Sequence, residues 1–251
     1  MCVVDGLNLE VEKRGMATKS KSKADDSETV ARAVLLELDN VGFAARGIAY
    51  ETLKRILAEK DVAIGRAQFS QFCVPLAPQR AIPALLARSG HSRLDPAKLA
   101  ERFAEEYRAA LCAPACKPLA GAVELVDTVR KAGVRVGLIT VLDHDTATAL
   151  AGRLGLAEGE ATLMFNSSED RNYPSVDSWL KLAKMTGVGP GLCAALASCG
   201  GSCRAALSAG MTCVAIPDDF TSFQDFGGAD QLIDRVTPEA IQAILDALAE
   251  R

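Results

Sequence analysis

The second half of the chain alternates short apolar runs with helix-forming stretches, and this alternation restricts the fold more than any other feature. The helix-forming stretches end at Gly133, Gly155, Gly187 and Gly210. Glycine is common just past a helix end because it adopts a left-handed backbone there without strain. Apolar runs such as VRVGLIT (134–140) and LCAALA (192–197) lie between these stretches. Strands alternating with helices predict an α/β fold with a Rossmann-like, doubly wound parallel sheet.

The first half of the chain has a different order. A near-continuous apolar run, AVLLEL at 33–38, is typical of a strand buried on both faces of a parallel sheet. Four helix-forming stretches without an intervening strand follow it, at residues 49–60, 66–72, 79–89 and 95–111. We therefore predict a helical cap at 44–116, inserted into a core formed by 31–43 and 117–251. Residues 1–30 include the polar stretch KSKSKADDSE, which has little to bury, and we predict a disordered tail there.

Charge and hydropathy exclude several classes of partner. The net charge is -4 at pH 7, which gives no electrostatic reason to expect binding to nucleic acid or to an anionic membrane. No apolar run approaches the roughly 20 residues that a membrane-spanning helix needs. The N-terminus lacks the basic and then apolar pattern of a secretory signal. We expect a cytoplasmic protein.

The eight cysteines do not look like a disulfide framework in a chain of this length, which agrees with a reducing compartment. Cys112 and Cys116 could join Cys199 and Cys203 in a zinc site, although their spacing is looser than the usual two intervening residues. A zinc or redox protein is therefore one functional hypothesis.

The predicted strand ends point to a candidate site. In a doubly wound sheet, ligands bind outside the carboxyl ends of the strands. The segments at these ends are residues 37–40, 140–145, 197–201 and 217–219, and they carry acidic and hydroxyl side chains.

Short motifs at these positions follow one another in a familiar order. They are ELDNV at 37–41, PLAG at 118–121, GLIT at 137–140, RNYP at 171–174 and ASCGG at 197–201. In their order, spacing and strand context they resemble the motifs Asp-x-Asp-Gly-Val, Pro-Leu-Pro-Gly, a strand ending in Ser or Thr, Lys-Pro-x-Pro and Glu-Asp-Ser. The chain therefore resembles the haloacid dehalogenase superfamily, in the capped subgroup typified by β-phosphoglucomutase and phosphoglycolate phosphatase. The resemblance covers about residues 33–233 and implies a phosphoric monoester hydrolase.

The resemblance also implies a role for each matching residue. In the family, the first aspartate attacks phosphorus, the second acts as general acid and base, and Mg²⁺ is held beside them. The implied set is catalytic Glu37 and Asp39, phosphate-binding Asn40, Thr140 and Arg171, and metal-binding Glu37, Asp39 and Ser198.

The chain departs from the family pattern at the residues that carry the chemistry. Glu37 is one methylene longer than the expected nucleophile, which displaces the carboxylate by on the order of 1 Å. Ala197 and Ser198 replace both acids of the last motif, and Mg²⁺ is usually held by one or two carboxylates together with phosphate. Arg171 replaces lysine and keeps the charge but not the geometry. Ala49 stands where phosphomutases of this type often have histidine.

Several of these residues have a second, structural interpretation. Glu37 and Asp39 could pair with Arg171 in a buried charge cluster that binds nothing. Thr140 could simply end a strand or cap a helix rather than bind phosphate.

Four further acids stand near the strand ends. Asp143 or Asp145 is expected to cap the next helix, with a role as a recruited metal ligand as the alternative. Asp218 and Asp219 are expected to be solvated loop residues, with replacement of the lost acids as the alternative.

Two functional hypotheses follow from the family pattern. The first is a catalytically impaired or inactive phosphatase homologue, a pseudoenzyme that binds a small phosphorylated molecule or a protein partner. The second is an active, Mg²⁺-dependent phosphomonoesterase that uses the Glu37–Asp39 site. We favour the first hypothesis because two independent losses affect the same metal site.

Overall fold

The structure is a computed structural model that describes residues 30–74, 78–91, 93–166 and 174–251. The predicted tail at 1–30 lies almost wholly outside these residues, and so does Arg171. Residues 31–251 group as one unit by their contacts, so the boundaries of the cap within this unit stay a prediction.

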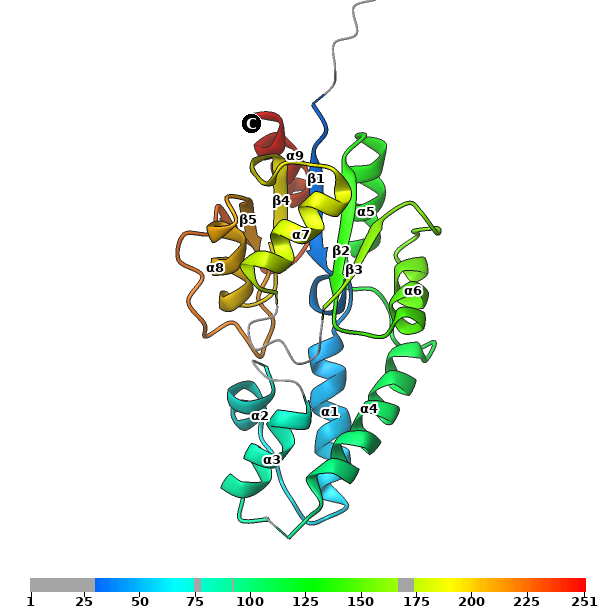
Figure 1. Cartoon of the computed structure of the whole chain (residues 1–251), viewed down its shortest axis with the longest axis vertical. Helices are drawn as coiled ribbons and strands as arrows, with labels where there is room; N and C mark the ends of the chain where they lie inside the picture. The colour runs from blue at the N-terminus through cyan, green and yellow to red at the C-terminus, as the bar shows by residue number, and fades with distance from the viewer. Residues whose placement is uncertain (1–29, 75–77, 92, 167–173) are drawn as a thin grey trace, which may run out of the picture. The chain divides into compact units, whose positions relative to one another are not determined.

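Within the described residues, six parallel strands form one sheet in the order β3-β2-β1-β4-β5-β6 (Figure 1). They are β1 (Ala33–Glu37), β2 (Arg135–Thr140), β3 (Thr162–Phe165), β4 (Cys193–Ala197), β5 (Thr212–Ala215) and β6 (Gln231–Leu232). Every residue of β1 and β4 is buried, as expected for strands that are covered on both faces. The predicted Rossmann-like, doubly wound parallel sheet is confirmed.

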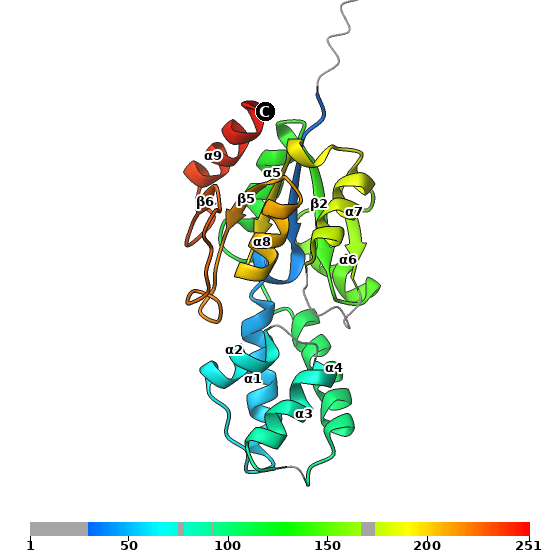
Figure 2. The same cartoon turned by 60° about the vertical axis from the view of Figure 1, so that its left-hand side comes forward.

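Helices cover both faces of the sheet (Figure 2). On one face, α5 (Ala122–Lys131), α6 (His144–Arg153) and α9 (Pro238–Ala249) share an apolar cluster with the strands. On the other face, α7 (Val176–Thr186) and α8 (Gly200–Ser208) share a second cluster, which contains the fully buried Trp179. Among the described helices, none combines the length and apolar character that a membrane crossing requires.

Four helices follow β1, in the part of the chain where the helical cap is predicted. They are α1 (Ala45–Ala58), α2 (Arg66–Cys73), α3 (Pro78–Arg88) and α4 (Pro96–Cys112). They pack around a third apolar cluster, which includes Leu53, Ile56 and Phe103. Phe220, from the loop that follows β5, belongs to the same cluster. The cluster of the four helices is therefore completed by a residue that comes from the sheet side of the chain.

The first strand and the helix after it differ from the prediction in their bounds. β1 ends at Glu37, and a π-helical turn, η1 (Leu38–Gly42), follows it. α1 begins at Ala45 rather than at residue 49 and ends at Ala58. The side-chain oxygen of Asn40 accepts a hydrogen bond from the backbone N–H of Arg46 at 3.1 Å. This bond satisfies a backbone N–H at the start of α1 with a side chain that lies before the helix. The sequence next to residue 45 therefore contains no ordinary capping residue that would mark the helix start.

Candidate functional site

The carboxyl ends of three neighbouring strands bring the predicted site residues together. Glu37 is the last residue of β1, Thr140 is the last residue of β2, and Ser198 directly follows β4. Asp39 lies in the turn η1 that continues β1. All four side chains are buried, with at most 3% of each residue exposed. Sequence reasoning thus identified a real cluster of polar side chains, and Arg171 is the predicted member that lies outside the described residues.

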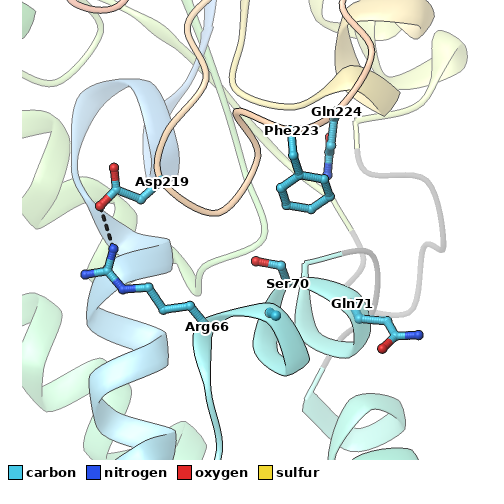
Figure 3. A pocket seen from close by; sticks show the side chains of 7 residues that line it. Arg66, Ser70, Gln71, Asp219, Phe223 and Gln224 are labelled. Atoms are coloured by element: carbon cyan, nitrogen blue, oxygen red, sulfur yellow. Dashed lines mark hydrogen bonds and ion pairs between the residues drawn. The ribbon is translucent and has the colours of Figure 1, made fainter.

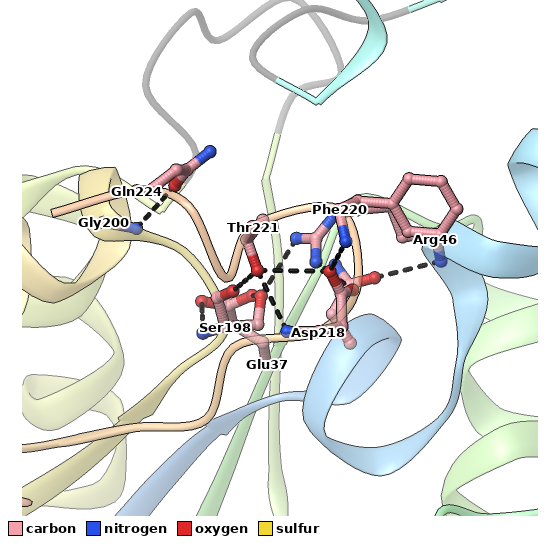
Figure 4. Close-up of polar contacts among 9 residues, drawn as sticks. Glu37, Arg46, Ser198, Gly200, Asp218, Phe220, Thr221 and Gln224 are labelled. Carbon is pink, nitrogen blue, oxygen red and sulfur yellow. Dashed lines mark hydrogen bonds and ion pairs between the residues drawn. The ribbon is translucent and has the colours of Figure 1, made fainter. Parts of the chain in front are cut away.

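Glu37 is held by Ser198 through both of its carboxylate oxygens. The backbone N–H of Ser198 donates to Oε1 at 3.0 Å, and the Ser198 hydroxyl donates to Oε2. Ser198 is itself the acceptor of a hydrogen bond from Nη2 of Arg46, at 3.0 Å from Oγ. A chain of donors therefore runs from the Arg46 guanidinium through the serine hydroxyl to the buried carboxylate (Figure 4).

The loop after β5 completes this network from the other side. Asp218 forms an ion pair with Nη1 of Arg46, and its Oδ1 accepts from the backbone N–H of Phe220 at 2.8 Å. The hydroxyl of Thr221 donates to the carbonyl oxygen of Ser198 at 2.8 Å. Asp218 is therefore more than the expected solvated loop residue: its carboxylate is paired with Arg46, and 33% of its side chain is exposed.

Asp39 has a separate set of partners. The Thr140 hydroxyl donates to Oδ1, and the backbone N–H of Val141 donates to Oδ2 at 3.3 Å. Burial raises the pKa of Asp39 from an ordinary 3.8 to about 7, and the negative charge of Glu37 adds to this rise. The two hydrogen bonds and the positive charge of Arg46 lower the pKa in part. Near neutral pH, Asp39 is therefore partly protonated, unlike an exposed aspartate.

The remaining predicted residues have structural partners. Asn40 holds the start of α1, as described above. The Asp143 carboxylate accepts from the backbone N–H of Thr146 at 3.0 Å and caps α6, so the capping interpretation is confirmed for Asp143. Asp219 forms an ion pair with Arg66 of α2, and 76% of its side chain is exposed.

Comparisons of sequence give distant relatives, and no family model matches the chain. The chain is 26% identical to protein CbbY of Rhodobacter capsulatus over 129 residues, which are 50% of this chain and 57% of that protein. It is 21% identical to the putative phosphatase YhcW of Bacillus subtilis (strain 168) over 217 residues, which are 86% of this chain and 97% of that protein. The chain thus matches little more than half the length of CbbY and nearly all of YhcW.

Solved structures show the fold. CbbY from Rhodobacter sphaeroides, in complex with phosphate, superposes with a TM-score of 0.71 at 20% identity, covering 88% of this chain and 100% of that chain. A β-phosphoglucomutase from Clostridium difficile gives 0.69 at 16% identity, covering 88% and 98%. A HAD hydrolase from Entamoeba histolytica gives 0.67 at 18% identity, covering 87% and 99%. This chain has the haloacid dehalogenase fold. The predicted resemblance to the capped, β-phosphoglucomutase-like type is confirmed at the level of the fold.

In this haloacid dehalogenase fold, the side chains that could serve as metal ligands do not fit the Mg²⁺ that such hydrolases use. The oxygens of Glu37 and Asp39 are engaged by N–H and O–H donors, and Asp218 faces a guanidinium. Ser198 offers only a neutral hydroxyl that already accepts from Arg46. Across the described ranges, no group of three or more His, Cys, Asp or Glu side chains could hold a metal ion. That finding also removes support for the alternative zinc site at Cys112, Cys116, Cys199 and Cys203.

A pocket lies between α2 and the loop after β5 (Figure 3). The pocket has a volume of about 430 Å³. Arg66, Ser70 and Gln71 line it from α2, and Phe223 and Gln224 line it from the loop. Asp219, in the same loop, also lines the pocket.

Arg46 belongs to the polar network around Glu37, and it was not predicted from the sequence. It lies in the first turn of α1, upstream of the predicted start of that helix, and 9% of its side chain is exposed. The available signal was a single arginine seven residues after Asp39, in a stretch that is otherwise apolar. The sequence does not show which residues Arg46 contacts, because Ser198 and Asp218 are more than 150 residues away along the chain.

Proposed function

We propose that this chain does not hydrolyse phosphate esters with magnesium and acts instead by binding a small phosphorylated molecule. The observation that carries this proposal is the state of Glu37, whose two oxygens both accept hydrogen bonds from Ser198. A nucleophile needs a free oxygen directed at phosphorus, with a cation to offset the repulsion between carboxylate and phosphate. Glu37 has neither while Ser198 holds it.

Two lines of support favour a phosphorylated ligand over a protein partner. The site keeps the Thr140 hydroxyl at the end of β2 and the Arg46 guanidinium at the start of α1, two kinds of group that bind anions, each bonded here to a neighbouring carboxylate. The fold neighbours include CbbY structures in complex with phosphate and with xylulose-(1,5)bisphosphate. The same ligand chemistry is our proposal for this chain.

The active phosphomonoesterase stays a second candidate because of one observation. Asp39 is buried, has a pKa of about 7, and therefore suits general acid and base catalysis near neutral pH. Its hydrogen bond from Thr140 would have to break before it could reach a leaving group. We favour binding because Asp39 has no free nucleophile beside it.

Inorganic phosphate tests the proposed binding directly. Calorimetric titration without magnesium should show weak binding to the wild-type chain, because Glu37 repels the anion. Glu37→Gln removes that charge and should tighten binding by roughly tenfold, or about 1.4 kcal/mol. Glu101→Gln, on the outer surface of α4, is the matched control and should leave binding unchanged. Phosphate binding that appears only when magnesium is added would contradict the proposal.

A further inference from the structure

We propose that Arg46 is a built-in cation that takes the electrostatic place of the divalent ion in this site. The proposal rests on the proposed function only in requiring that no magnesium acts here. Arg46 contacts Ser198, at the position where the family has an acid, and also the carboxylate of Asp218. Figure 4 shows both contacts converging on one guanidinium.

The position of Arg46 is central to the charges of the site. Burial raises the pKa of Asp39 and of the Cys199 thiol, which lie on different elements, and the positive charge of Arg46 offsets part of each rise. The negative charge of Glu37 has the opposite effect and raises both of these pKa values. Arg46 therefore contacts Asp218 directly and reaches the Glu37 carboxylate through the Ser198 hydroxyl.

A guanidinium can take the place of a metal ion in stabilising the fold, but its chemistry does not let it replace the metal in catalysis. A guanidinium is always charged and presents several N–H donors in a fixed plane, so it can satisfy two acceptors at once. It cannot bring a carboxylate and a phosphate oxygen into one coordination sphere, as a divalent ion does. It donates to Ser198 and Asp218 and leaves Glu37 locked by the serine hydroxyl.

The ion pair is unlike an ordinary surface salt bridge. The side chains of Arg46 and Asp218 are 9% and 33% exposed, whereas those of Arg66 and Asp219 are 59% and 76% exposed. Surface pairs contribute little to stability because water screens them. Arg46 is the buried member of its pair, and a buried charge that loses its partner is costly. The two arginines therefore form a matched comparison within one molecule.

Thermal unfolding with and without millimolar magnesium tests the inference. Wild-type Tm should not change with magnesium. Arg46→Ala should have a lowered Tm that magnesium raises again, because an ion that binds only the folded state stabilises it. Arg46→Lys keeps the charge and should not respond to magnesium, and neither should the exposed control Arg66→Ala. A purely structural role for Arg46 would lower the Tm without creating any response to the ion.

Three results would overturn the inference. They are a magnesium response in the wild type equal to that of Arg46→Ala, a folded Arg46→Ala that responds no more than Arg66→Ala, and failure of both Arg46→Ala and Arg46→Gln to fold even with magnesium. Magnesium-dependent phosphate binding by the wild type would instead overturn the proposed function. The two failures are thus distinguishable.

Discussion

The free energy of unfolding of the wild type should fall by about 4 kcal/mol between about pH 4 and pH 7, and Asp39→Asn should abolish this fall. The reason is the raised pKa of Asp39, from an ordinary 3.8 to about 7 in the folded state. Each pKa unit corresponds to about 1.4 kcal/mol. In this interval the unfolded chain has released its proton while the folded chain keeps it, so stability falls as pH rises.

The measurement is the free energy of urea unfolding for wild type and Asp39→Asn at a series of pH values. The stability of the wild type relative to the variant should decline from about pH 4 to pH 7 and then level off. In the variant, the asparagine amide can donate to the Thr140 hydroxyl, which can rotate to accept. A protonated Asp39 would make the same hydrogen bond, so the variant mimics the protonated wild type. Asp246→Asn, at an exposed position on α9, is the control and should not reproduce the effect. A difference that stays constant with pH would show that Asp39 titrates normally.

Phe220→Ala should destabilise the fold by roughly 3–5 kcal/mol, the usual cost of removing a buried phenyl ring. Phe220 is 5% exposed, and its ring lies 5.4 Å from that of Tyr50 and 5.3 Å from that of Phe69. Both partners come from the helices α1 and α2, whereas Phe220 comes from the loop after β5. The ring therefore joins the apolar cluster of the helices to the sheet side of the chain.

Phe223→Ala provides the matched control for that loss. It removes the same side chain from the same loop, but Phe223 is 70% exposed and should change stability by less than about 0.5 kcal/mol. Urea unfolding of the two variants gives both values. Equal effects would mean that the Phe220 ring does not anchor the loop to the helices.

Much of the fold could be predicted because its signals are local. The run from Ala33 to Glu37 is apolar at every position except the last, and a strand covered on both faces has that pattern. α7 has the predicted bounds, with Ser175 as its cap and Gly187 in the left-handed conformation past its end. Both signals lie within a few residues of the element that they define.

The parts that could not be predicted depend on contacts between distant segments. The turn η1 and the early start of α1 rest on Asn40, whose side chain reaches a backbone N–H six residues on. Arg46 becomes meaningful only when the strand order places Ser198 beside Glu37. No periodicity in the sequence shows that Phe220 leaves its loop to join the helices. These features are set by tertiary structure, which a single sequence does not display.

Turnover of p-nitrophenyl phosphate by the wild-type chain, measured with and without magnesium, tests the central claim most directly. The account predicts no magnesium-dependent release of p-nitrophenol, because Glu37 is held by Ser198 and the cation beside it is Arg46. Release that requires magnesium and disappears in Asp39→Asn would contradict it.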